Sequence, residues 1–136
     1  MKQEIKDKWV AALRSGEYQQ TRSTLRDGTG FCCLGVLTDI YTKENNLDWD
    51  HRKDFKGEYY SVCSSLLELP NRVVEWAELP RRDPRVKLSD DIHIEYTEEV
   101  GDMEFISLSQ LNDGIYSAPL TFSKIADIIE NQKYFI

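Results

Sequence analysis

The most continuously apolar stretch of this chain is Gly-Phe-Cys-Cys-Leu-Gly-Val-Leu-Thr-Asp-Ile-Tyr, residues 30–41. Its apolar residues recur at the i, i+1, i+4, i+7 and i+8 spacing of one helix face. They are Cys33, Leu34, Leu37, Ile40 and Tyr41. We therefore predict a helix over residues 32–45 as the buried centre of the fold. Gly35 interrupts good helix formers at a cost of about 1 kcal/mol relative to alanine, so we expect another element or a ligand to approach the backbone there.

Further helices are predicted on both sides of this one. Residues 2–15 place apolar side chains at helical spacing and stop at Gly16. Residues 70–79 begin with a proline, which suits the first turn of a helix. A short helix or turn over residues 107–113 ends at Asn-Asp-Gly. Thr121 caps a final helix with a clear 3.6-residue period.

The remaining segments predict loops and a small sheet. Residues 17–26 are mixed polar residues that suit an extended segment or a structured loop. We read residues 48–57 as a charged connection anchored by Trp49 and Phe55, and residues 58–62 as a short strand. Residues 86–88, 92–97 and 103–106 alternate apolar with polar residues, which predicts an antiparallel meander with one acidic face. The fold class predicted is α+β: one domain over residues 1–136, with three to five helices around the central helix and a small antiparallel sheet.

Composition bounds the class of protein. With 136 residues, 40% hydrophobic and 30% charged, the chain fits a globular domain, and its longest apolar run falls short of the ~18 residues of a membrane helix. Its charged N-terminal residues lack the apolar stretch of a secretory signal, so we expect a cytoplasmic protein with no membrane partner. Three cysteines, two of them adjacent, predict reduced thiols and no disulfide framework.

The net charge of −7 is concentrated in the C-terminal third. Residues 1–88 carry 15 Lys and Arg against 14 Asp and Glu, whereas residues 89–136 carry 2 against 10. Direct binding of nucleic acid is disfavoured, because neutralising phosphates requires a basic face. The acidic run over residues 90–104 is either a solvated surface or a mimic of nucleic-acid phosphate that occupies a basic groove on a host protein.

An anion pocket is the first candidate site. The backbone N–H groups that begin the central helix favour a negative charge, and two arginines precede them. Aromatic side chains nearby are suited to stacking on a base. The candidate ligand-binding residues are Tyr18, Gln20, Arg22, Arg26, Phe31 and Cys32, with Tyr59 and Tyr60 as further stacking residues. The alternative is that the arginines are ordinary surface residues and the aromatics belong to the core.

A thiol nucleophile is the second candidate. Cys32 or Cys33 at a helix N-terminus, with Gln19 or Gln20 upstream and His93 downstream, follows the order of glutamine, cysteine and histidine in papain-like hydrolases. The alternative, which we favour, is that both cysteines are small hydrophobic core residues. No Cys-x-x-Cys or His-x-x-x-His spacing is present, so we predict neither a metal site nor a cofactor.

A set of residues in order along the chain carries a resemblance: Trp9, Leu13, Gly16, Tyr18, Gln20, Leu25, Phe31-Cys32-Cys33-Leu34-Gly35-Val36-Leu37, Leu69-Pro70, Val74, Trp76-Ala77, Leu79, Leu108, Leu111-Asn112-Asp113, Phe122, Ile125-Ala126 and Ile129. With these residues the chain resembles a group of small, uncharacterised proteins common in bacteriophage genomes. Thr38 stands where such sequences often carry a further cysteine. The resemblance covers nearly the whole chain and implies a phage accessory protein made in the bacterial cytoplasm.

The resemblance favours binding over catalysis. We expect a non-catalytic protein that binds and neutralises a host defence protein or a small nucleotide-like signal, and the sequence allows a homo-oligomer. The alternatives are a cysteine hydrolase or transferase that uses Cys32 or Cys33 with His93, and an acidic nucleic-acid mimic.

Overall fold

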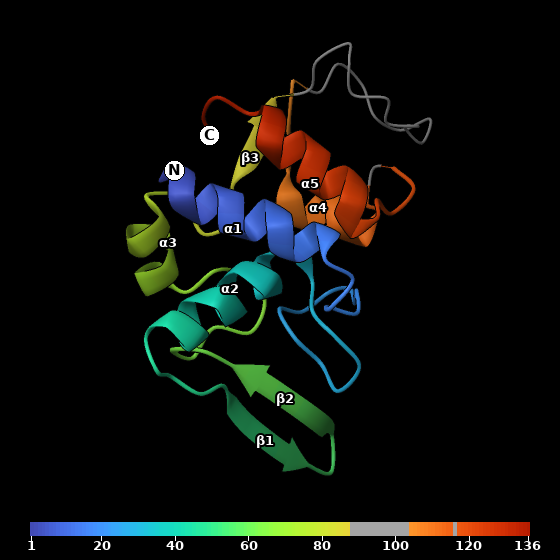
Figure 1. Cartoon of the computed structure of the whole chain (residues 1–136). Helices are drawn as coiled ribbons and strands as arrows, with labels where there is room; N and C mark the ends of the chain where they lie inside the picture. The colour runs from blue at the N-terminus through green and yellow to red at the C-terminus, as the bar shows by residue number, and fades with distance from the viewer. Residues whose placement is uncertain (88–103, 116) are drawn as a thin grey trace.

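The computed structural model describes residues 1–87, 104–115 and 117–136. Within them the chain forms five helices and two antiparallel two-stranded sheets, which confirms the predicted α+β class. In chain order the elements are α1 (Gln3–Arg14), α2 (Cys33–Glu44), β1 (Asp50–Asp54), β2 (Gly57–Ser61), α3 (Asn71–Ala77), β3 (Arg85–Lys87), β4 (Phe105–Ser107), α4 (Leu108–Asp113) and α5 (Phe122–Asn131). Figure 1 shows α1 between α5 and α2, with the β1–β2 hairpin beyond α2 and β3 at the end that holds both termini.

The helices α1 and α5 pack side by side and each buries one face. Trp9 is fully buried and its indole N–H donates to the carbonyl of Cys33 (2.9 Å), which ties α1 to α2. At the surface, Arg14 donates to Asp127 (2.6 Å) and Glu130 (2.7 Å) and so joins the last turn of α1 to α5. As predicted, Thr121 caps α5, accepting from the backbone N–H of Lys124.

The central helix α2 is buried around most of its circumference. All side chains from Cys33 to Asp39 are buried, whereas Ile40, assigned from the sequence to the buried stripe, is half-buried. The buried face predicted from the sequence was therefore narrower than the surface that α2 buries, because α1, α3 and α4 all pack against this helix. Thr38 is buried although it lies outside the predicted stripe, and its hydroxyl is satisfied within the helix because it donates to the carbonyl of Leu34 (2.9 Å).

The glycine inside α2 marks a close approach of the backbone, as expected. A Cβ on Gly35 would lie 1.8 Å from the carbonyl oxygen of Leu25. The loop that carries Leu25 is held by backbone hydrogen bonds from Cys32 to Leu25 (3.0 Å) and from Phe31 to Gln19 (2.9 Å). Residues 17–31 thus form a structured loop that crosses over the start of α2.

The prediction for residues 48–57 was wrong in its secondary structure and in one of its two anchors. Instead of an irregular connection they supply strand β1, which pairs with β2 in an antiparallel hairpin from Asp50↔Ser61 to Asp54↔Gly57. Trp49 is partly buried against the core, but Phe55 in the turn is 94% exposed and anchors nothing within the described residues. The charged composition hid the strand, because both faces of β1 are exposed and no apolar alternation exists to reveal it.

The second sheet is antiparallel, as predicted, but the predicted meander was wrong, because its first and third segments pair directly with each other. β3 pairs with β4 in antiparallel register, Val86 opposite Ile106, and both of these side chains are buried. The expected middle strand over residues 92–97 lies outside the described residues. Ser107 begins α4 with a capping box, in which its side chain accepts from the N–H of Gln110 and the Gln110 side chain accepts from the N–H of Ser107.

The close contact at Gly35 predicts whether alanine at this position raises or lowers the free energy of unfolding. We expect Gly35→Ala to lower the free energy of unfolding by about 3 kcal/mol or more, because the new methyl group meets backbone that cannot move aside independently. Chemical denaturation measures the change. Gly28→Ala is the control, since its Cβ would meet only the movable carboxylate of Glu58 at 3.1 Å. A rise of about 1 kcal/mol in the free energy of unfolding of Gly35→Ala, as helix propensity alone would give, would contradict the close approach of the loop to α2.

Candidate functional site

The N-terminus of α2 is closed by the protein itself. The backbone N–H of Cys33 donates to Oδ1 of Asn112 (3.1 Å), and the N–H of Gly35 donates to the sulfur of Cys32 (3.4 Å). Both cysteines and Asn112 are buried. The expectation that these N–H groups bind an anion was therefore wrong, because α4 places the side-chain amide of Asn112 where the anion would have to lie.

The two thiols lie in the core, as the favoured interpretation of the cysteines requires. Burial raises the pKa of Cys32 to about 12, and burial likewise raises the pKa of Cys33 well above its usual value. Cys33 Sγ lies 3.6 Å from the carbonyl oxygen of Leu108. A nucleophilic thiol must be accessible and must ionise, and burial in the core opposes both. His93, its proposed partner, lies outside the described residues.

The six candidate ligand-binding residues separate into two groups. Gln20 and Cys32 serve the fold: Gln20 donates to Asn112 (3.0 Å) and to the carbonyl of Leu120 (2.8 Å). Arg22 is exposed, and its guanidinium makes no hydrogen bond within the described residues. Tyr18, Arg26 and Phe31 do come together, but next to the β1–β2 hairpin rather than at a helix N-terminus.

Arg26 is surrounded by aromatic rings, an arrangement we call the Arg26 cluster: Arg26, Phe31, Trp49 and Tyr60. Its guanidinium carbon lies 4.4 Å from the ring centroid of Tyr60, 5.0 Å from Phe31 and 5.5 Å from Trp49. The ring of His51 stacks on Tyr60 at 4.3 Å, with the two planes 3° apart. The guanidinium of Arg26, which was expected from the sequence to bind a ligand, thus attaches the hairpin to the 26–31 loop.

A buried carboxylate supports the same region from α2. Asp39 accepts from the hydroxyl of Tyr18 (2.6 Å) and the indole N–H of Trp49 (3.0 Å), and it pairs with Lys43 (3.0 Å). Desolvation together with the hydrogen bond to Asp39 raises the pKa of Tyr18 to about 12. Desolvation opposes ionisation of Asp39, but the bonds from Tyr18, Lys43 and Trp49 outweigh it and lower the pKa of this carboxyl.

The loop before Phe31 is ordered by a second carboxylate. Asp27 accepts from the hydroxyls of Thr21 and Thr29 and from the backbone N–H groups of Thr29 and Gly30. Although desolvation favours its neutral form, these bonds lower the pKa of Asp27 to about 2. The carboxylate therefore stays charged and holds the loop that presents Arg26 and Phe31.

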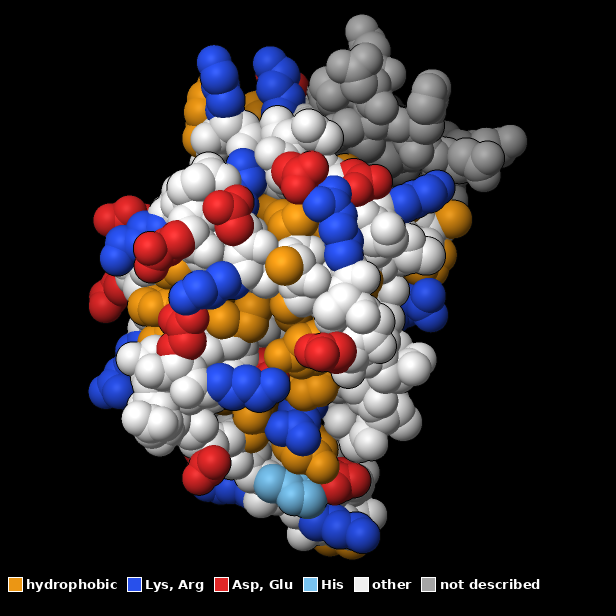
Figure 2. All heavy atoms as spheres, viewed as in Figure 1, with side chains coloured by type: hydrophobic (Ala, Val, Ile, Leu, Met, Phe, Trp, Pro, Cys, Tyr) orange, Lys and Arg blue, Asp and Glu red, His pale blue; other side chains and the backbone are white. Residues whose placement is uncertain are grey.

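The hairpin itself is the most exposed regular element of the described chain. Every residue of β1 is exposed, and residues 57–59 of β2 are exposed as well. We call residues 52–56 the hairpin tip; it joins the exposed ring of Phe55 to three basic side chains, Arg52, Lys53 and Lys56, and one acidic one, Asp54. Figure 2 shows basic and hydrophobic side chains together at this end of the molecule.

No group of three His, Cys, Asp or Glu side chains in residues 1–87, 104–115 and 117–136 is placed to hold a metal ion. None of the helices that the structure describes is long and apolar enough to cross a bilayer.

Comparison with known proteins identifies the family. A family model described as "Domain of unknown function (DUF8296)" matches residues 1–133. The chain belongs to this family. The match spans all the helices and strands described above, so the Arg26 cluster and the hairpin tip are parts of the family's domain. No curated protein and no solved structure matches the chain.

The environments of the three thiols predict an ordered pattern of alkylation. In native protein at pH 8 we expect iodoacetamide to label exposed Cys63 and to leave Cys32 and Cys33 unmodified, because a pKa of about 12 leaves only about one Cys32 in 10,000 ionised. All three should react in denaturant. Peptide mass spectrometry measures the labelling. Reaction of Cys32 or Cys33 at the rate of Cys63 in the native state would support the hydrolase alternative.

Proposed function

We propose that the protein is a non-catalytic, phage-type accessory protein of the bacterial cytoplasm that binds and neutralises a host protein through its hairpin tip. The observation that carries this proposal is an almost fully exposed phenylalanine, Phe55, on a hairpin that the body of the protein holds in place. The phage origin and the compartment rest on the sequence resemblance. The buried thiols support binding over catalysis.

Rigidity is the property that suits the hairpin to docking. A two-stranded hairpin is at best marginally stable by itself in water. Here the Arg26 cluster holds β2 by a cation–π contact with Tyr60, a type of interaction worth about 0.5–2 kcal/mol. The backbone N–H of Lys56 donates to Asp54 (2.8 Å) within the turn and orders the tip as well. A preordered element loses less conformational entropy on binding than a flexible loop.

The side chains of the tip specify the partner's chemistry. An exposed aromatic ring gains most when a complementary apolar pocket removes it from water, and such anchors dominate binding energy in protein interfaces. The surrounding Arg52, Lys53 and Lys56 outnumber Asp54. The partner we propose is therefore a host protein with an apolar cavity rimmed by acidic side chains.

Two alternatives retain weaker support. A hydrolase or transferase would need one of the buried thiols to become accessible. The acidic-mimic alternative depends on residues 90–104, most of which lie outside the described residues, so it stays a prediction from the sequence.

Site-specific photo-cross-linking tests the docking proposal. With p-benzoylphenylalanine in place of Phe55, irradiation of bacteria that produce the protein should yield one dominant adduct with a host protein. The same probe in place of Tyr134, which is 69% exposed on the segment after α5, is the matched control and should not yield it.

The purified partner then decides the proposal. We expect Phe55→Ala to weaken its binding about 30- to 1,000-fold without lowering the melting temperature, because Phe55 makes almost no packing contacts. Tyr134→Ala should leave the affinity unchanged, and Arg26→Ala should weaken binding by releasing the hairpin. Equal adducts from positions 55 and 134, or full affinity in Phe55→Ala, would refute the hairpin as the docking element.

A further inference from the structure

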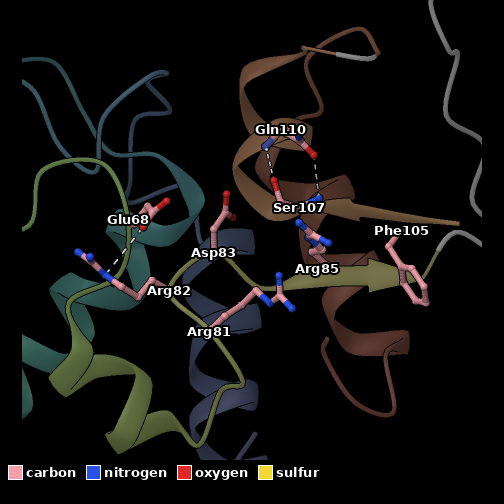
Figure 3. Close-up of a pocket in the computed structure, with 8 residues that line it drawn as sticks. All are labelled: Glu68, Arg81, Arg82, Asp83, Arg85, Phe105, Ser107 and Gln110. Carbon is pink, nitrogen blue, oxygen red and sulfur yellow. Dashed lines mark hydrogen bonds and ion pairs between the residues drawn. The ribbon is translucent and has the colours of Figure 1, made fainter. Parts of the chain in front are cut away.

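A polar pocket lies away from the hairpin, between the segment before β3 and the start of α4. Its volume is about 590 Å³, within the range of roughly 300–1,000 Å³ of small-molecule sites. Three arginines line it, Arg81, Arg82 and Arg85, and Phe105 forms one side. Figure 3 shows Arg81 and Arg85 extending from the chain before β3 and from β3 itself toward the same region, between Asp83 and Phe105.

Two charged groups of the pocket are committed to the fold. Arg82 donates to the carbonyl of Leu69 (2.9 Å) and to the hydroxyl of Ser65 (2.7 Å), and it lies 3.9 Å from Glu68. Asp83 accepts from the backbone N–H and the hydroxyl of Ser109. These bonds fix the floor of the pocket, and its three arginines still outnumber the two carboxylates that line it, Glu68 and Asp83.

Arg81 and Arg85 are the cations available to a ligand. Neither guanidinium makes a hydrogen bond or ion pair with another of the described residues, although both line the pocket. The backbone that carries them is restrained by Pro80 and Pro84 and by hydrogen bonds from Leu108 to the carbonyl of Pro84 (3.0 Å) and from Arg85 to the carbonyl of Ile136 (2.8 Å). Two guanidinium groups on fixed backbone suit an anion with several oxygens, above all a phosphate.

The register of the β3–β4 sheet explains why a ring stands beside these cations. Val86 and Ile106 are paired and point into the core, so their neighbours Arg85 and Phe105 lie on the opposite face, where the pocket is. Phe105 is half-buried, which leaves part of its ring available for stacking. The pocket thus combines cationic groups with an aromatic surface.

From this combination we infer that the pocket binds a nucleotide, with its phosphates on Arg81 and Arg85 and its base against Phe105. This site differs in every residue from the Arg22 and Arg26 site expected from the sequence. It is also independent of docking through the hairpin tip, because the two involve different elements of the fold. A ligand with both phosphate and ring should bind more tightly than either part alone.

Calorimetry with purified full-length protein tests this inference, using ADP, AMP, inorganic pyrophosphate and adenosine as probes at low ionic strength. We expect ADP to bind more tightly than pyrophosphate and adenosine to bind least. Arg81→Ala and Arg85→Ala should each weaken ADP binding about 10- to 100-fold, since each removes a charge-assisted hydrogen bond. Phe105→Leu should weaken ADP but not pyrophosphate, because only the stacking surface is lost.

Controls separate this site from others. Arg22→Ala removes another exposed arginine, from the loop before α2, and should leave ADP binding unchanged. Phe55→Ala should also leave it unchanged, so that failure of the docking proposal and failure of this one are distinguishable. Melting temperatures of the unliganded variants confirm that each is folded. Lack of ADP binding at millimolar concentration, unchanged ADP binding in both Arg81→Ala and Arg85→Ala, or an equal loss in Arg22→Ala would overturn the assignment.

Discussion

One side-chain amide, that of Asn112, holds the centre of this fold together. Its oxygen accepts from the backbone N–H of Cys33 and from Gln20, and its nitrogen donates to the carbonyl of Thr21 (2.9 Å) and to Asp113 (3.0 Å). The residue is fully buried, so each of these bonds lies where an unpaired polar group would cost about 1–3 kcal/mol. A single group therefore joins α4 to the start of α2 and to the loop directly before it, 79 to 92 residues away in the sequence.

This closure removes the start of α2 as a site for an anion or a reactive thiol. A helix N-terminus with free amides attracts anions and lowers thiol pKa values, but an N-terminus satisfied by a neutral amide in a dry core does neither. The cysteines then act as small apolar side chains, and Gly35 allows the loop to pack directly on the helix. Arginine and aromatic side chains come together instead at two places on the surface: the hairpin, held by Arg26, and the pocket that contains Arg81 and Arg85.

Sequence reasoning succeeded where one element's own pattern decides its structure. The central helix, the Thr121 cap and the close approach at Gly35 all follow from local rules of helix periodicity, capping and glycine placement. It failed where long-range contacts decide. Nothing local indicates that Asn112, 79 residues away, would occupy the position of the expected anion. The rings around Arg26 come from three separate segments, and β1 lacks apolar alternation because both its faces are exposed. The sequence Arg-Arg-Asp-Pro-Arg-Val-Lys over residues 81–87 is basic, but only the fold places Phe105 beside it.

Hydrogen exchange at the backbone N–H of Cys33 tests the closed helix N-terminus most directly. The first N–H groups of a helix have no partner within the helix and ordinarily exchange quickly. If Asn112 closes this end, the Cys33 N–H should exchange only through global unfolding, with a free energy of opening equal to that from denaturant unfolding, and should lose that protection in Asn112→Ala. Exchange of this amide within minutes in the native wild-type protein, as for an open helix end, would contradict the account.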